Sequence, residues 1–152
     1  MRKAALLLIA AAACHHGPDQ QQLEHDAAVA MAESTRVFTE ESPKLRDALA
    51  TVSADVAVRS DRTLADVHDL VATIDRVLAA DDPAIAASDA FMATGPQLDD
   101  QTAALQTQMH EHNQTMHHLR DRLAAIKPPL GEAETDEITK AMMNAGMMLM
   151  LQ

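Results

Sequence analysis

Apolar residues recur every three or four positions along most of the chain, which is the spacing of an amphipathic helix. The first such stretch runs from Leu23 to about Phe38 and predicts a helix with small residues on its buried face: Leu23, Ala27, Ala30, Ser34 and Val37. Ser42-Pro43 then predicts a new helix start, because Ser caps helix N-termini and Pro suits the first helical position.

The next stretch is the longest, and its apolar stripe contains one inserted step near Ser60: Leu45, Leu49, Val52, Val56, Ser60, Leu64, Val67, Val71, Ile74 and Leu78. This spacing predicts a long coiled-coil-like helix, and the inserted step is a stutter that relaxes a supercoil. Asp81-Asp82-Pro83 predicts its end, followed by a short helix through Met92. Gly95-Pro96 predicts a turn.

A second long stripe alternates steps of four and three without interruption: Leu98, Thr102, Leu105, Met109, His112, Met116, Leu119, Leu123 and Ile126. Pro128-Pro129 predicts its end, since neither proline can continue the hydrogen-bond ladder. A last helix is predicted from about Glu134 to Leu151. Its apolar residues form one face with Ile138, Met142, Ala145 and Leu149, and a second face with Met143, Met147 and Met150.

These stripes predict an all-α protein: an elongated antiparallel helical bundle with two long coiled-coil-like helices and shorter flanking helices. With two Phe, four Gly and no Tyr or Trp, the core must come from aliphatic residues and Met. We expect residues 23–152 to form a single domain. The alternative is an extended coiled-coil oligomer, but the Pro and Gly breakers favour folding back within one chain.

The N-terminus has the order of a secretory signal. Arg2 and Lys3 are basic, residues 4–10 are apolar, and Ala11-Ala12-Ala13 precedes Cys14, the only cysteine. Because Cys14 has no partner in the chain, an internal disulfide is excluded. One interpretation is a signal that is cleaved after an A-x-A site and leaves Cys14 unmodified.

The Ala-Ala-Ala-Cys sequence resembles the lipobox of bacterial lipoproteins. That resemblance implies a signal peptide over residues 1–13, an acyl anchor on Cys14, and a flexible tether over residues 14–22. Position 15 is His, not the Asp that retains some lipoproteins in the inner membrane. The resemblance therefore implies an exported protein anchored in the outer membrane and facing the periplasm, if the host has two membranes.

The chain is acidic, which limits its partners. Without residues 1–13 it loses Arg2 and Lys3, so ten basic residues remain against 23 acidic ones, a formal net charge of −13. Such a chain is a poor nucleic-acid binder and is repelled by anionic membrane surfaces. The expected partners are the lipid membrane, reached through the acyl anchor, and another protein or a second copy of the chain.

Four of the eight histidines lie in residues 108–118, QMHEHNQTMHH. At about 100° per residue, Met109, His112 and Met116 fall on the predicted buried face. His110 and His117 lie beside that face, and His118 lies opposite. No two histidines are separated by four residues, as zinc-binding helices require, and no Glu precedes a His by three residues, as di-iron bundles require.

Three interpretations of Met109, His112 and Met116 remain. Two thioethers and an imidazole form a soft ligand set suited to Cu(I), and the Met-rich last helix can supply a fourth ligand. Met also fills gaps in ordinary cores, and a buried His can fix helix register. The third interpretation is a histidine whose charge responds to pH.

Nothing in the sequence points to catalysis. It contains no Gly-rich phosphate loop, nucleophile elbow or Cys–His arrangement, and we interpret Asp55, Asp61, Asp66, Asp69 and Asp75 as a solvated face. We therefore expect a non-catalytic interaction or scaffold module. The alternative function is a periplasmic copper-binding or copper-sensing protein. The C-terminal AMMNAGMMLML either is buried as a bundle member or docks on a partner.

Overall fold

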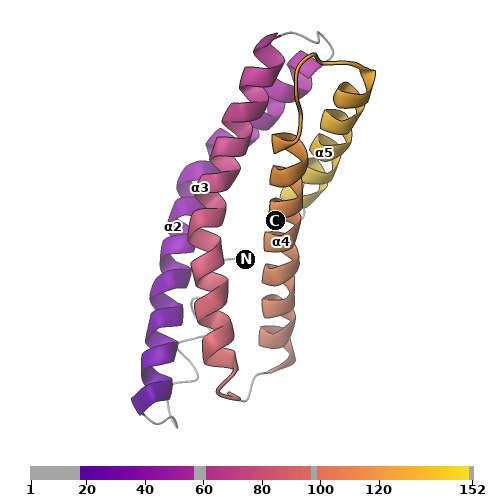
Figure 1. Cartoon of the computed structure of the whole chain (residues 1–152). Coiled ribbons are helices and arrows are strands. Elements are labelled where there is room, and N and C mark those ends of the chain that lie inside the picture. Colours follow the sequence, from indigo (N-terminus) through magenta and orange to yellow (C-terminus); the bar gives the residue numbers. More distant parts are fainter. Residues whose placement is uncertain (1–17, 57–60, 97–98, 151–152) are drawn as a thin grey trace. The chain divides into compact units, whose positions relative to one another are not determined.

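The computed structural model describes residues 18–56, 61–96 and 99–150, and the side chains of residues 19–56, 62–96 and 99–144. The described residues form helices without any strand. The helices are α2 (Pro18–Asp55), α3 (Asp61–Met92), α4 (Asp100–Ala124) and α5 (Glu132–Met150), labelled in Figure 1. The prediction of an all-α fold is confirmed. Because α2 begins at Pro18, part of the predicted tether over residues 14–22 is helical; Pro suits this first position, where its missing N–H has no intrahelical partner.

The described residues belong to two compact units. Unit 1 draws on residues 1–39 and 77–113, and unit 2 on residues 40–76 and 114–152. The helices α2, α3 and α4 each contribute residues to both units, whereas α5 contributes to unit 2 alone. The units are therefore not two consecutive segments of the sequence.

In unit 1, α2 and α3 lie side by side and antiparallel (Figure 1). Gln20, near the start of α2, donates a hydrogen bond to Thr94, just beyond the end of α3, at 2.8 Å. Further along α2, Ser34 donates to Asp81, which comes earlier in α3. As one residue number rises the other falls, which is the signature of antiparallel pairing.

The pairing of α3 with α4 in unit 1 follows the same rule. Asp89 accepts a hydrogen bond from Gln106 at 3.2 Å, and Asp82 accepts one from Asn113 at 2.8 Å. Unit 1 is therefore built from antiparallel neighbours in chain order.

Unit 2 adds α5 to the same arrangement. Ion pairs join its successive helices: Glu41–Arg76 for α2 and α3, Asp75–Arg120 for α3 and α4, and Arg122–Glu137 for α4 and α5. This packing is consistent with a helical bundle.

Aliphatic side chains and Met supply most of the buried core, as the composition predicts. In unit 1 the buried apolar residues include Ala27, Met31, Val77, Leu78, Ala84 and Phe91. In unit 2 they include Leu45, Leu49, Val52, Val67, Leu70, Ile74, Met116, Leu119, Leu123, Ile126, Ile138 and Ala141. Leu105, another predicted core residue, is half-buried.

Pro43 does not begin a helix, so this prediction is wrong. The helix α2 continues through Pro43, whose side chain is exposed, and Ser42 lies inside the helix with a buried Oγ that makes no hydrogen bond. A proline inside a helix costs about 3 kcal/mol. Burial of Leu45, Leu49 and Val52 on the same face stabilises the helix by roughly 1.5–3 kcal/mol each, which outweighs that cost.

The predicted long helix over residues 45–78 is also wrong. The helix α2 ends at Asp55 and α3 begins at Asp61, so the predicted stripe is divided between two helices; residues 57–60, with the predicted stutter at Ser60, lie outside the described residues. Pro83, predicted to end that helix, is exposed inside α3. Thr63 and Leu70 are fully buried, whereas the predicted positions Leu64 and Val71 are only half-buried.

The ends of the helices follow local chemistry. Asp99 caps α4, because its Oδ1 accepts hydrogen bonds from the backbone N–H of Thr102 at 2.7 Å and from its hydroxyl at 2.8 Å. These bonds, the backbone one first, lower the pKa of Asp99. At the start of α5, Glu134 accepts the N–H of Gly131 at 2.9 Å, the reciprocal half of a capping box. The predicted turn after α3 is confirmed by Gly95, whose φ of 72° is left-handed.

Candidate functional site

The three residues of the predicted copper site all lie on α4. Met109 and His112 are half-buried and belong to unit 1, and they are neighbours on the helix surface because they are three residues apart. The ring of Phe38 approaches His112 edge-on, with centroids 6.3 Å apart and an interplanar angle of 76°. Met116 is buried and belongs to unit 2. Unit 1 thus brings together one thioether and one imidazole.

The other histidines of this segment differ in their surroundings. His110 is exposed, and its Nε2 lies 2.9 Å from Oδ1 of Asp89 on α3, so it is paired rather than simply solvated. His118 is exposed and His117 is half-buried. His110 therefore helps to join α3 to α4 in unit 1, beside the face of α4 that was predicted to be buried.

No group of three or more His, Cys, Asp or Glu in the described part of the chain is placed to hold a metal ion. Met is not among those residue types, so the soft set of Met109, His112 and Met116 stays a prediction. Cys14, the predicted lipidation position, lies outside the described residues. Within those residues, no helix is both long and apolar enough to cross a membrane.

The Met-rich helix α5 presents two different faces to its surroundings. Ile138 and Ala141 are buried in unit 2, whereas Met142 is half-buried and Met143 is 65% exposed. Side chains from Ala145 onward lie outside the description. The helix is thus held by a buried face and keeps at least one large apolar side chain in contact with solvent.

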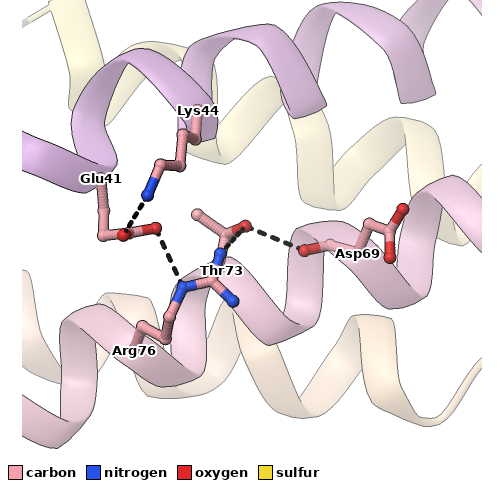
Figure 2. Close-up of polar contacts among 5 residues, drawn as sticks. All are labelled: Glu41, Lys44, Asp69, Thr73 and Arg76. Carbon is pink, nitrogen blue, oxygen red and sulfur yellow. Dashed lines mark hydrogen bonds and ion pairs between the residues drawn. The ribbon is translucent and has the colours of Figure 1, made fainter.

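Unit 2 contains a polar network around a glutamate whose side chain is only 9% exposed, Glu41 of α2 (Figure 2). Lys44 Nζ donates to Glu41 Oε1 at 2.6 Å, and Arg76 Nε donates to Glu41 Oε2 at 3.0 Å. Arg76 also donates to the hydroxyl of Thr73 at 2.9 Å, and that hydroxyl donates to the backbone carbonyl of Asp69 at 2.9 Å.

Both carboxylate oxygens of Glu41 therefore have charged donors. The hydrogen bond from Lys44, followed by that from Arg76, lowers the pKa of Glu41. A buried charge left without a partner is strongly unfavourable. Lys44 lies on the same helix as Glu41, so the contact with Arg76 is the one that favours this register of α2 against α3. The network fixes the alignment of these two helices in unit 2.

Unit 1 also contains a buried polar contact between α2 and α3. The side chains of Ser34 on α2 and Asp81 on α3 are both buried, and the Ser34 hydroxyl donates to Asp81 Oδ1. The positions of Glu41 and Asp81 were missed from the sequence because both stand two residues before a proline, in stretches interpreted as helix breakers. The sequence did indicate that Glu41 and Asp81 lie on a buried face, since each continues the spacing of three and four residues in its helix.

The predicted solvated acidic face is partly wrong. Asp69 and Asp75 are exposed, in agreement with the prediction. Asp55 and Asp66, however, have side chains that are only 24% and 17% exposed. They lie on α2 and α3 of unit 2, on either side of Arg62, and form the second polar cluster that sequence reasoning missed.

Comparison with known proteins returned no relative: no protein-family model, curated protein or solved structure matches the chain.

Proposed function

We propose that the chain is a lipid-anchored, non-catalytic interaction or scaffold module of the cell envelope. The observation that carries this proposal is the order of its N-terminus: two basic residues, a short apolar stretch and Ala-Ala-Ala before Cys14. In a lipoprotein, the cysteine after such a triplet carries the acyl chains. The acidic composition adds support: without residues 1–13 the chain has ten basic and 23 acidic residues, a formal net charge of −13, which an anionic surface repels, and a covalent anchor would hold it there.

The side-chain arrangement supports a role in binding rather than chemistry. In both units the interior is filled by aliphatic side chains, and the buried polar groups Glu41 and Asp81 are engaged in contacts between helices. Met143 on α5 and Val29 on α2 are large apolar side chains that remain exposed. Exposed apolar side chains of this kind are available for contact with a protein partner.

The anchor is tested with Cys14→Ser and with His15→Ser as the matched control. Cells producing each form are fractionated, and the membranes are washed with high salt to remove proteins held by charge alone. We expect wild type and His15→Ser in the washed membranes and Cys14→Ser in the soluble fraction. Retention of Cys14→Ser in washed membranes would refute the anchor.

The interaction role is tested by placing a photo-crosslinking residue at Met143 or Val29, one exposed apolar position in each unit. A partner surface on one unit gives a discrete crosslinked product from that position and not from the other. Equal, diffuse labelling from both positions would contradict a defined interaction surface.

We further propose that the long helices pack in the manner of a coiled coil. A stripe of seven buried residues on α3 supports this, because they are spaced alternately by four and three residues: Thr63, Val67, Leu70, Ile74, Val77, Asp81 and Ala84. A repeat of this kind is typical of left-handed supercoils. An experimental structure with straight helices and no knobs-into-holes contacts would contradict it.

The second candidate function is Cu(I) binding or sensing through Met109, His112 and Met116. The observation in its favour is the placement of Met109 and His112 as partly buried neighbours on one helix face. Thioether and imidazole ligands suit Cu(I). Titration of the chain with Cu(I) should show binding that is weakened in Met109→Leu and Met116→Leu but kept in Met92→Leu, which removes a half-buried thioether from α3, a helix with no proposed ligand. Equal binding by all these forms would refute the assignment.

A further inference from the structure

Two aspartates approach each other where α2 ends and α3 begins, within unit 2. Asp55 is the last residue of α2, and Asp66 lies in the second turn of α3. One carboxylate oxygen of each, Oδ2, is shielded from solvent and makes no hydrogen bond within the described part of the chain. A shielded oxygen without a donor is unfavourable, because it has lost its water and gained nothing in return.

Among the described residues, Arg62 places a positive charge close to both oxygens. Arg62 Nε is 3.2 Å from Oδ2 of Asp55 and 3.9 Å from Oδ2 of Asp66, so both oxygens lie around the same atom. Neither contact is an aligned hydrogen bond, and the Arg62 side chain is 75% exposed. Arg62 therefore supplies charge to the pair without filling the missing donor position of either carboxylate.

The missing donor has a simple chemical identity. An ionised carboxylate only accepts hydrogen bonds, so two of them facing each other cannot bond. When one carboxyl carries a proton, its O–H becomes a donor to the other, and both shielded oxygens can then be satisfied. Two carboxyl groups that share a site in this way hold one proton more tightly than an isolated group does.

The electrostatics of Asp66 agree with this geometry. Burial raises the pKa of Asp66, and the side-chain contact with Asp55 and the negative charges of Asp55 and Asp69 raise it further. Arg62 opposes them by stabilising the ionised form. The charged groups that act on Asp66 thus come from the end of α2 and from its own helix.

We propose that Asp55 and Asp66 bind one proton between them, and that this shared proton joins the end of α2 to the start of α3. In acid the pair carries one negative charge opposite Arg62 and an O–H···O bond between the helices. When the proton leaves, two like charges face each other beside one cation, and the contact weakens. The junction is therefore a proton-responsive contact, independent of the proposed anchor and of any copper site.

The pH dependence has a definite sign. A carboxyl whose pKa is raised in the fold binds its proton more tightly there than in the unfolded chain, where the pKa is about 3.9. Its stabilising contribution is complete below the unfolded pKa and is lost as pH rises through the folded pKa. This is the reverse of the usual behaviour of a carboxylate in an ion pair.

The test compares the full chain with Asp66→Asn, measuring urea unfolding midpoints from pH 3 to pH 8. Asn has nearly the same shape as Asp, and its NH₂ group can donate to Asp55 at every pH. We expect Asp66→Asn to have the higher midpoint at pH 7, with the difference shrinking as the wild-type pair takes up its proton. Asp47→Asn, at an exposed position of α2 in the same unit, is the matched control and should follow wild type throughout.

Carbon-13 NMR of the carboxyl groups in the wild-type chain tests the pair without any substitution. We expect one of the two carboxyls to titrate above the ordinary value of about 3.9. The proposal is overturned if both titrate at the ordinary value or below it, or if Asp66→Asn has a lower midpoint than wild type at pH 7.

Discussion

Replacing Pro43 with Ala should make the protein more stable, because the structure places Pro43 inside α2 rather than at a helix start. Proline has no N–H, so the carbonyl four residues earlier, on Thr39, lacks its helical donor, and the ring crowds that carbonyl. The side chain of Pro43 is exposed, so its removal takes away little packing. Alanine restores the missing donor and fits the helix without strain.

The expected gain can be worked out from two opposing effects. Proline is about 3 kcal/mol less favourable than alanine inside a helix. Proline also restricts the unfolded chain, and losing that restriction lowers stability by about 0.4–1 kcal/mol. The net gain is about 2 kcal/mol. For a chain of this length, such a gain raises Tm by roughly 4–8 °C.

Urea unfolding followed by circular dichroism at 222 nm measures this gain directly. With a slope of about 2 kcal/mol per molar urea, the midpoint of Pro43→Ala should lie about 1 M above that of wild type. Pro96→Ala is the control: Pro96 follows α3 outside any helix, so only the small loss from the unfolded chain is expected. An unchanged or lower midpoint for Pro43→Ala would refute the placement of Pro43 inside a helix.

Three further predictions concern the core, one turn and the pH dependence. Ile74→Ala removes a fully buried side chain and should lower the free energy of unfolding by about 2–5 kcal/mol. The control Val71→Ala removes a half-buried side chain and should lower it by roughly 1 kcal/mol. Urea titration measures both. Gly95→Ala should cost about 1–2 kcal/mol in the same assay, because φ is 72° and a Cβ there would contact nothing within 4 Å, so the cost is conformational. The pKa of Glu41 is lowered in the fold by Lys44 and Arg76. The stability that Glu41 contributes is therefore present above its unfolded pKa and is lost as pH falls through the folded pKa. Glu41→Gln should lower the urea midpoint at pH 7 and converge with wild type in acid, whereas Asp66→Asn should raise the midpoint at pH 7.

The parts of the fold that could be predicted are those in which mostly apolar residues mark one face of a helix. The stripe from Leu98 to Ile126 predicts a helix, and α4 runs from Asp100 to Ala124. The last helix, predicted from about Glu134 to Leu151, runs from Glu132 to Met150. In both cases the breakers between the helices, Gly131 and the proline pair before it, lie outside the helices, where their ordinary effect on the backbone applies.

The parts that could not be predicted depend on polar residues whose partners are far away in the sequence. Glu41 pairs with a residue 35 positions later, and Ser34 pairs with one 47 positions later. Without those partners, a buried Glu or Asp is far too unfavourable to place on a buried face. The sequence alone therefore favours a break in the helix at Glu41 and at Asp81, whereas the end of α2 at Asp55 falls inside what looks like one continuous stripe.

For the candidate copper residues, the sequence predicts their spacing along one helix but not their contacts with other helices. The 3.6-residue period correctly places Met109 and His112 beside each other, and Met116 two turns from Met109, because that follows from the helix alone. It does not indicate which other helices pack against each of them. The contact of His112 with Phe38, from α2, depends on the fold of unit 1, as does the pairing of His110 with Asp89.

The prolines and the buried acids belong to one physical arrangement. Glu41 and Asp81 each precede an exposed proline by two residues. In both α2 and α3, the position where the proline cannot donate a backbone hydrogen bond therefore lies beside a buried polar contact with the other helix. Proline removes one intrahelical bond, and the neighbouring contact holds the helix against its partner where that bond is missing. If the two effects are coupled, Pro43→Ala should reduce the loss of stability caused by Glu41→Gln. A double-mutant cycle measures this directly, and strictly additive effects would show that the proline and the buried acid act independently.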